Sequence, residues 1–505
     1  MVGRSEDLKP VSKAGGASRL PHIQRGAALA LTCIASAVLA ACAVGPDFKQ
    51  TAAPKVDSYT MQSLPDTTAS APGVAGDAQH FVMGRDIPFA WWEQFNSAKL
   101  NALVERSLKA NPTIPAAQAA LKQAQEYVAA QGGYFYPNIG LGLNAQRQKA
   151  PVSSGSPGIY NLYTSQLNLS YTPDVLGSNR RQVESLKAQA EQLRFQMAAT
   201  YISLANNVVA AVIQEASLQD QIDAVQALLL QNEKAVRILH DQARLGYAMA
   251  IDVAAQELTL AQAQASLPPL QKQLEQTHDL IRALVGALPN EALDDNFHLA
   301  DLTLPQDLPV TLPSRLVAQR PDVRAAEEQV HAASARVGVA LAARLPQFNI
   351  SGASGGQANQ FGQMFSSGGA LWTIAAGLTQ PIFDGGTLMH NQRAAEQGLL
   401  QAQAQYQSAV ITAFQNVADT LHAVQSDANA LVANRKAEKA AKVVMDLTLK
   451  KQQLGYVDTL TLLTAQEAYQ QAELALIQAQ TNRYGDTAAL FQAVGGGWWN
   501  LPELN

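Results

Sequence analysis

Cysteine is almost absent from this 505-residue chain, which contains only Cys33 and Cys42. Both lie near the N-terminus, so no disulfide is expected in the rest of the protein. The eight histidines are scattered, and no group of His, Cys and Asp has the spacing of metal ligands. The glycine clusters at 385–386 and 495–497 lie outside the context of a nucleotide-binding loop. The sequence therefore argues against an enzyme and predicts neither a metal nor a bound cofactor.

Long apolar runs and aromatic residues are scarce as well. No stretch of 18 consecutive apolar residues occurs, so no transmembrane helix is predicted. Hydrophobic residues make up 47% of the chain but aromatic residues only 6%. Most of the hydrophobic residues that are not aromatic are alanines, and glutamines are frequent between them. This composition favours long, closely packed helices over an ordinary globular core.

The first 41 residues have the composition of a secretory signal. Arg19 and Arg25 precede an apolar run at residues 27–39, which ends in Leu-Ala-Ala-Cys at Cys42. The run is too short to span a membrane as a helix. The ending resembles a bacterial lipobox, which predicts that Cys42 becomes the first residue and carries a covalent lipid. An ordinary cleavage site that happens to precede a cysteine is the alternative. Ala43, in place of an aspartate, favours the outer membrane.

The charge balance of the processed chain is acidic. Removal of residues 1–41 takes away five Lys/Arg and two Asp/Glu, which changes the formal net charge from −5 to −8. No nucleic-acid partner is expected for such a chain. An exported, lipidated protein without a transmembrane helix can still cross a membrane as a β-barrel.

The body of the chain is duplicated with an offset of 209 residues. A short alternating stretch begins near Pro137 and again near Pro346, and each copy leads into a long helical pattern. Leu-Gly-Tyr occurs at 245–247 and again at 454–456. A repeat of strand, loop, strand and long helix is too large for a solenoid unit. It therefore indicates two related halves in one chain.

Each half contains stretches with the alternation of β-strands. Apolar side chains share one side of each stretch, with polar or small residues on the other side; they are Tyr163, Leu167, Leu169 and Tyr171 in the first half and Trp372, Ile374, Ala376 and Leu378 in the second. The strands are about 9–11 residues long, which is the length of a tilted transmembrane strand. A half-buried sheet of a soluble protein alternates identically. The export signal and the long helices favour membrane hairpins.

The helical segments are unusually long. Residues 180–245 contain neither proline nor glycine and carry apolar residues at three- to four-residue spacing. As one helix this segment would be roughly 100 Å long at ~1.5 Å per residue. Residues 387–454 repeat the design. No other part of the chain is large enough to bury such helices, so they are expected to pack on each other as coiled-coil pairs.

Six segments are predicted along the chain. They are a signal peptide at 1–41; a lipidated, extended tether at 42–96; a first repeat at 97–286, with a hairpin at 138–172, a long helix at 180–245 and a return helix at 251–286; a linker at 287–313; a second repeat at 314–494, with a hairpin at 347–380, a long helix at 387–454 and a return helix at 459–494; and a tail at 495–505. Pro268 and Pro269 predict a kink or a break in the first return helix.

Five motifs resemble those of the TolC-like outer-membrane efflux factors, in their NodT- or OprM-like lipoprotein branch. They are Cys-Ala-Val-Gly-Pro-Asp-Phe at 42–48, Trp-Trp-Glu-Gln-Phe at 91–95, Arg-Pro-Asp-Val-Arg at 320–324, Pro-Ile-Phe-Asp-Gly-Gly at 381–386 and Gly-Gly-Gly-Trp at 495–498. The resemblance implies a mixed fold of membrane β-barrel and long α-helical barrel. In a homotrimer, four strands per chain would close a 12-stranded barrel, continued across the periplasm by a helical tunnel.

The resemblance also implies a function. The chain would be a lipid-anchored outer-membrane duct of a Gram-negative bacterium, through which drugs or other small molecules leave the periplasm passively. A periplasmic adaptor protein would join it to an inner-membrane transporter of the RND type. Ducts for protein secretion or metal export are alternatives, and the dispersed methionines disfavour metal export. A pore-less coiled-coil scaffold lipoprotein is a further alternative, against which the alternating hairpins argue.

In this family the tunnel closes at its periplasmic tip, after each Leu-Gly-Tyr. The matching positions here are the turn glycines Gly246 and Gly455 and the gate residues Asp252, Tyr456, Asp458, Leu460, Thr461, Leu463 and Thr464. Rings of the two aspartates around a pore axis would favour cations or, with Tyr456, hold a closed hydrogen-bond network. The two leucines would form an apolar constriction. Capping of helix starts is the alternative role of both aspartates.

Two further expectations concern this gate and the membrane interface. Relatives often carry an acidic residue where Thr461 or Thr464 stands, so the second tip is less charged here. The two turns are also where an adaptor is expected to dock. Tyr134, Phe135 and Tyr136 precede the first strand and are predicted to form part of an aromatic girdle, with packing at the helix–strand junction as the alternative.

Overall fold

The structure is a computed structural model that describes residues 43–501 except 53, 63–64, 150–157 and 294–295. The predicted signal peptide and the predicted lipidation of Cys42 therefore lie outside the described residues. The chain divides into two units. The first contains residues 1–45, 135–181 and 341–383, and the second contains residues 46–134, 182–340 and 384–505. Each unit is considered by itself.

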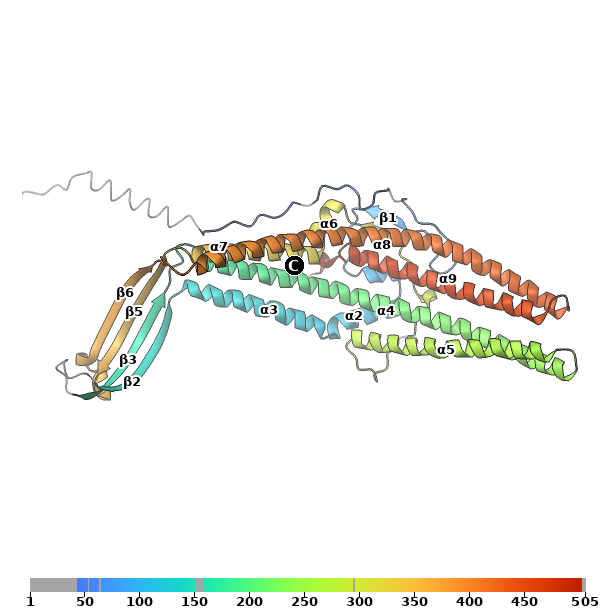
Figure 1. Cartoon of the computed structure of the whole chain (residues 1–505), viewed down its shortest axis with the longest axis horizontal. Helices are drawn as coiled ribbons and strands as arrows, with labels where there is room; N and C mark the ends of the chain where they lie inside the picture. Colours follow the sequence, from blue (N-terminus) through green and yellow to red (C-terminus); the bar gives the residue numbers. More distant parts are fainter. Residues whose placement is uncertain (1–42, 53, 63–64, 150–157, 294–295, 502–505) are drawn as a thin grey trace, which may run out of the picture. The chain divides into compact units, whose positions relative to one another are not determined.

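The first unit is a four-stranded antiparallel sheet in the order β2-β3-β5-β6 (Figure 1). Its strands are β2 (Asn138–Lys149), β3 (Ile159–Tyr171), β5 (Gln347–Ala358) and β6 (Ala370–Thr379). They lie in the two hairpins predicted from the alternating stretches. Strands β2 and β6 form the edges, and neither has a partner on its outer side within the described part of the chain.

The two faces of this sheet differ sharply in polarity. The register pairs Leu141 with Leu167 and Gly352 with Ile374, so most of the large apolar residues of the four strands share one face. That face is uncovered in the chain, and Trp372 and Ile374 are 77% and 76% exposed. The other face carries mostly polar and small residues, with Leu162 and Leu371 on it near the loop end of the sheet. An exposed apolar face on a long-stranded sheet is the pattern of strands that contact lipid.

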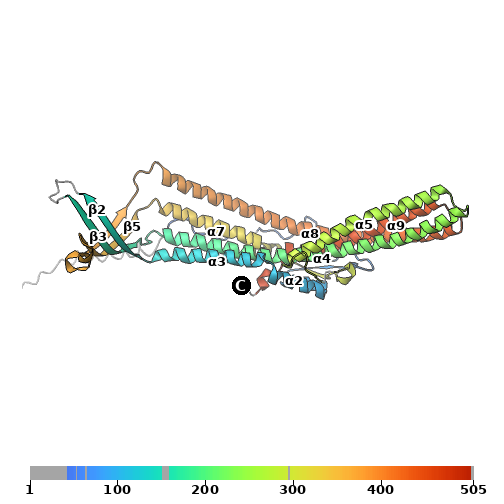
Figure 2. The same ribbon diagram turned by 90° about the horizontal axis from the view of Figure 1, so that it is seen from below.

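The second unit is built around long helices. They are α3 (Thr113–Gly132), α4 (Ser178–Arg244), α5 (Ala250–Leu284), α7 (Pro321–Ala342), α8 (Thr387–Gln453) and α9 (Thr459–Ala493), with the shorter α2 (Ala98–Ala110) and α6 (Pro313–Gln319). Helices α4 and α8 each contain 67 residues. Figures 1 and 2 show α5 running back along α4, and α9 along α8. The long helices therefore form pairs, as the sequence predicted.

The prolines of α5 do not divide it. Pro268 and Pro269 lie inside a single helix of 35 residues, so of the two predicted outcomes, a kink or a break, the break is excluded. Contacts with α4 hold α5 on its N-terminal side, where the amide of Gln256 donates to the buried Asn232 at 3.1 Å. On the other side of the prolines, His278 of α5 lies 3.5 Å from Glu215 of α4. Packing on both sides of the prolines keeps the helix continuous, although the two prolines lack the backbone N–H groups that would donate hydrogen bonds within it.

Two short strands lie in the segments that the sequence predicted to be a tether and a linker without strands. Strand β1 (His80–Met83) lies in the segment predicted as a tether, and β4 (Asp307–Val310) lies in the predicted linker. They pair in parallel. A four-residue strand is too short to show a period, and its partner is far away in the sequence, so neither was detectable from local pattern.

The main core gathers around Trp91 of the 3₁₀ helix η1 (Trp91–Phe95). Trp91 is fully buried and stacks on Phe491 of α9, with ring centroids 5.1 Å apart. Trp92 is buried beside it. Both tryptophans are therefore packing residues, and they attach the segment before α2 to the end of the last helix.

One described helix passes a simple test for a membrane span. Helix α4 contains an 18-residue window with a mean hydropathy of 1.3, but 61% of that window is buried inside the protein. Core helices of soluble proteins pass the same test, so the result is weak evidence for a span. The apolar window is accounted for by packing within the second unit.

A carboxyl pair lies between α8 and α9. Burial, together with a hydrogen bond between Asp427 of α8 and Asp486 of α9, raises the pKa of Asp427 to about 7, although Arg483 opposes the shift. The guanidinium of the fully buried Arg483 donates to Thr68 Oγ1 at 3.1 Å and to the carbonyl of Ala69 at 3.3 Å. Arg483 therefore holds the N-terminal segment against α9 while it faces the carboxyl pair.

The raised pKa predicts a pH-dependent stability. The folded protein holds a proton on Asp427 that the unfolded chain releases near its ordinary pKa of ~3.9, so stability falls as pH rises from about 4 to about 7. We expect Asp427→Asn to raise the melting temperature at pH 8 and to change it much less at pH 5. Thermal unfolding at both pH values measures this. Asp419→Asn, an exposed site on the same helix, is the control; equal shifts of Asp427→Asn at both pH values would contradict the assignment.

Candidate functional site

The two turns that join the long helices to their return helices have the same geometry. Gly246 and Gly455, 209 residues apart, have φ of +79° and +76°. In each turn the next residue, Tyr247 or Tyr456, donates its N–H to the carbonyl five residues earlier, at 2.8 and 2.9 Å. Each glycine N–H donates three residues back at 3.0 Å. These bonds form a Schellman helix stop, which requires a left-handed residue and thus explains both glycines.

The return helices start with two complementary caps. The Asp458 carboxylate is the N-cap of α9 and accepts from the Thr461 N–H at 2.8 Å and from its hydroxyl. In α5 the carboxylate comes from inside the helix, where Asp252 accepts from the N–H of Met249 at 3.1 Å. With the 209-residue offset, Asp252 corresponds to Thr461, and Met249 to Asp458. The two halves thus place the carboxylate at opposite ends of the same four-residue cap.

Capping favours the charged form of the Asp458 carboxylate. Hydrogen bonds from Thr461 lower the pKa of the Asp458 carboxyl below its ordinary value. Asp458 is exposed and Asp252 half-buried. Both residues therefore perform the capping role considered as an alternative, and Asp458 in addition presents a negative charge to solvent.

The tip exposes more apolar side chains than the sequence analysis identified. Tyr456 and Leu460 are exposed, as a role at the tip requires. Large side chains beyond the predicted gate residues are exposed as well; they are Leu245, Tyr247, Met249, Ile251 and Leu454. The internal repeat contained the signal for two of them, because Tyr247 corresponds to Tyr456 and Ile251 to Leu460.

Leu463 lies in a different environment from Leu460. Leu463 is 8% exposed, whereas Leu460 is 64% exposed. Both line a groove of about 410 Å³ between α4, α5 and α9, together with Thr464, whose hydroxyl donates to the Leu460 carbonyl at 3.0 Å. Burial therefore favours packing of Leu463 within its own chain, and the apolar constriction made jointly by the two leucines stays a prediction.

Apolar residues are also exposed at one end of the sheet. Phe135 and Tyr136 precede β2, and Ile382 and Phe383 follow β6, so all four belong to the same end. Tyr134, which belongs to the helical unit, is exposed too. This exposure argues against the alternative of packing at a junction. Ile382 and Phe383 were noticed only as part of a motif, although they are among the most exposed apolar side chains.

No group of three or more His, Cys, Asp or Glu residues that would hold a metal ion occurs in the described parts of the chain.

The hydroxyl of Tyr456 makes no hydrogen bond to the described residues of the chain. Any network that Tyr456 joins must therefore involve another molecule.

The turn geometry predicts opposite effects for two glycine substitutions. Gly455→Ala puts a side chain in the left-handed region and should cost roughly 1–2 kcal/mol locally. We expect faster hydrogen exchange of the amides of residues 454–457. Gly398→Ala is the control, because Gly398 lies inside α8 and an added Cβ meets nothing within 4 Å in the chain. That change should be neutral or stabilise by about 0.5–1 kcal/mol; equal effects at both sites would contradict the helix-stop assignment.

Comparison with known proteins gives one consistent family. The model described as "Outer membrane efflux protein" matches residues 103–287 and 312–496, which are the two halves of the duplication. The pyoverdine export outer membrane protein OpmQ of Pseudomonas putida is 27% identical over 417 residues, which cover 81% of this chain and 88% of OpmQ. The toluene efflux pump outer membrane protein TtgF of Pseudomonas putida is 26% identical over 93% of this chain and 96% of TtgF.

Solved structures agree. The outer-membrane channel OprN has a TM-score of 0.81 and 26% identity, over 90% of this chain and all of that one. VceC of Vibrio cholerae has a TM-score of 0.76 and 26% identity, over 82% of this chain and all of that one. The exposed apolar sheet and the paired long helices are the barrel and tunnel parts of such channels. The chain therefore belongs to the outer membrane efflux protein family and is an outer-membrane channel of an efflux system.

Proposed function

We propose that three copies of this chain form a passive exit duct for small organic molecules. The observation that carries the proposal is the sheet, which has an exposed apolar face and two unpaired edges, β2 and β6. Unpaired backbone groups in hydrocarbon cost several kcal/mol each. Pairing of β6 with β2 of the next copy removes both edges, and three copies give the 12 strands of a closed barrel.

The polar face of the sheet would line the duct. It carries amides, hydroxyls and small residues, such as Gln166, Asn168 and Thr373. The only charged residues in the four strands are Arg147 and Lys149, at the end of β2 and on the apolar side by register. A neutral polar wall offers little selection by charge, which suits a passive conduit whose cargo is chosen elsewhere. The names of the relatives refer to pyoverdine and toluene, which supports organic cargo in preference to metal ions or proteins.

The tip would be the gate and the site of assembly. Three copies of Asp252 and Asp458 would place six carboxylates around the pore axis, which favours cations. The exposed Tyr456 and Leu460 would contact neighbouring copies when the tip is closed. The groove between α4, α5 and α9 and the two turns would receive a periplasmic adaptor, which joins the duct to an inner-membrane transporter of the RND type. A lipid on Cys42 would anchor each copy in the outer membrane.

The proposed barrel predicts a difference between neighbouring residues of β6. Ile374→Arg places a charge on the lipid face, where it should cost ~2–4 kcal/mol per copy near the membrane centre. Thr373→Arg faces the duct and should be tolerated. The yield of heat-modifiable trimer in outer-membrane fractions measures both. Normal assembly of Ile374→Arg, or failure of Thr373→Arg alone, would reverse the assignment of the two faces and so refute the barrel.

The proposed gate predicts that the charges of Asp252 and Asp458 matter to ion selectivity independently of the helix caps that these residues form. Asparagine is as good an N-cap as aspartate at position 458, and the side-chain carbonyl of an asparagine at position 252 can still accept from the Met249 N–H, as the glutamine of a capping box does. Asp252→Asn/Asp458→Asn should therefore keep the turns folded while it removes the six charges. We expect a clear loss of cation selectivity, measured from reversal potentials in planar bilayers under a KCl gradient.

Alanine at both positions serves as the comparison, because it removes the caps as well. It should reduce the protection of both turns from hydrogen exchange, whereas the asparagine pair should not. Unchanged selectivity in the asparagine pair would show that capping is the whole role of these carboxylates and would sink the charged gate.

A further inference from the structure

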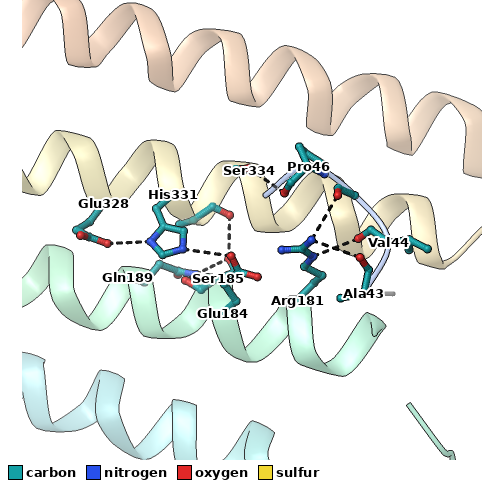
Figure 3. A network of polar contacts seen from close by, with 12 residues as sticks. Ala43, Val44, Pro46, Arg181, Glu184, Ser185, Gln189, Glu328, His331 and Ser334 are labelled. Carbon is teal, nitrogen blue, oxygen red and sulfur yellow. Dashed lines mark hydrogen bonds and ion pairs between the residues drawn. The ribbon is translucent and has the colours of Figure 1, made fainter. Parts of the chain in front are cut away.

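The first described residues of the chain are held by one buried arginine. Arg181, the fourth residue of α4, is 5% exposed. Its Nε donates to the carbonyl of Val44 at 3.2 Å, and its Nη2 approaches the carbonyls of Ala43 at 3.4 Å and Gly45 at 3.3 Å (Figure 3). Three successive carbonyls thus converge on one guanidinium. Arginine offers five N–H donors in a rigid fork, which suits this arrangement, whereas lysine presents a single point.

The turn before α4 completes the site. The N–H of Val44 donates to the carbonyl of Leu176 at 3.2 Å. Gly177 has φ of +77°, and a Cβ added to it would lie 2.5 Å from Ala43 Cα. Glycine is therefore required both by the backbone conformation and by the close approach of Ala43. The chain is bound through its backbone and through shape, so the site is built for an extended peptide.

The neighbouring arginine has a different task. Arg180 is bound to Asp174, with Nε 3.2 Å from Oδ2. The same carboxylate accepts the N–H groups of Asn179 at 2.8 Å and Arg180 at 2.9 Å, so it caps the start of α4. Asp174 and Arg180 thus stiffen the turn, and Arg181 is the residue that binds the N-terminal segment.

The helical unit holds the next residues separately. Phe48 stacks on His331, with ring centroids 4.3 Å apart and planes inclined by 13°. The Ser334 hydroxyl donates to the Pro46 carbonyl at 3.4 Å. His331 is itself oriented by Glu184 and Glu328, each 3.2 Å from one of its ring nitrogens (Figure 3). Residues 43–48 are therefore fixed along their length, which a simple flexible tether would not need.

We propose that Arg181 and Gly177 form a receptor for the N-terminal segment of the processed chain, and that this receptor fixes where the lipid of Cys42 enters the membrane. The proposal rests on the lipidation proposed above. Cys42 precedes Ala43 directly in the sequence, so a lipid on Cys42 would be attached one residue before the bound segment. The lipid is thereby held in place by the protein, and its anchoring does more than keep the chain near the membrane.

The position of the receptor in the sheet unit supports this role. The turn at 172–177 follows β3, so it belongs to the end of the sheet where β2 begins and β6 ends. The exposed residues Phe135, Tyr136, Ile382 and Phe383 belong to that same end. Acyl chains released there would enter the lipid beside the apolar face, at the level of the aromatic girdle.

Hydrogen exchange of the full-length protein, purified from outer membranes as folded trimers, tests the receptor. We expect Arg181→Gln to exchange at least tenfold faster than wild type in peptides that cover residues 43–49, because the Val44 amide loses its protection. Lys187→Gln removes a charge from an exposed site six residues further along α4, away from the turn and the segment, and should leave these peptides unchanged. Equal exchange in wild type and Arg181→Gln would overturn the proposal.

A second variant and the wild type itself guard against misfolding. Gly177→Ala, which blocks the approach of Ala43, should release the same peptides while Arg181 remains present. If neither variant assembles, hydrogen exchange of the wild-type protein decides the question. Exchange of residues 43–49 at the rate of an unstructured peptide would refute the receptor, and strong protection of these residues would support it.

Mass spectrometry of the same N-terminal peptide separates this proposal from the lipidation on which it rests. An acylated Cys42 with protected residues 43–49 supports both. An unmodified Cys42 would refute the role in placing a lipid, even if the exchange data show the segment to be bound.

Discussion

The pairing of backbone N–H and C=O groups in the four-stranded sheet is the constraint on which the rest of the structure depends. A sheet with an apolar outer face belongs in hydrocarbon, where water cannot pair its edges. One chain supplies β2, β3, β5 and β6, which leaves two edges open. Closure with other copies is the direct solution. The internal duplication supplies both hairpins, and pairing with other copies of the chain would close the two edges that remain.

The long helices meet a related problem by different means. Helices α4 and α8 are too long for any one core to cover. Each is paired with its return helix, and the pairs contain buried polar contacts such as Gln256 with Asn232. Such a contact fixes the register of two alanine-rich surfaces that would otherwise slide, because a shifted register leaves an amide unpaired. The turn glycines then end both long helices at equivalent positions.

Charged side chains in this protein repeatedly satisfy backbone groups. Arg483 binds carbonyls of the N-terminal segment in the core, and Arg181 binds those of residues 43–45. Asp174, Asp252 and Asp458 each accept N–H groups at helix starts. These contacts attach irregular segments to regular ones, which is where a protein made of long helices and a sheet has few apolar contacts to use. At the second turn the Asp458 carboxylate both caps α9 and has a lowered pKa, so one side chain combines a structural role with an exposed negative charge.

The sequence by itself determined the duplication, the two hairpins, the long helices and the turn glycines, because each depends on local periodicity or on one backbone conformation. It also placed Asp252 and Asp458 at the tip, although only the hydrogen bonds revealed that one caps from within its helix and the other from before it. Tertiary structure alone decided the β1–β4 pair, the burial of Leu463 and the continuity of α5 through two prolines. It alone brought Arg181 to residues 43–45. These features join residues that are distant in the chain or depend on which helix face is covered, and neither leaves a period in the sequence.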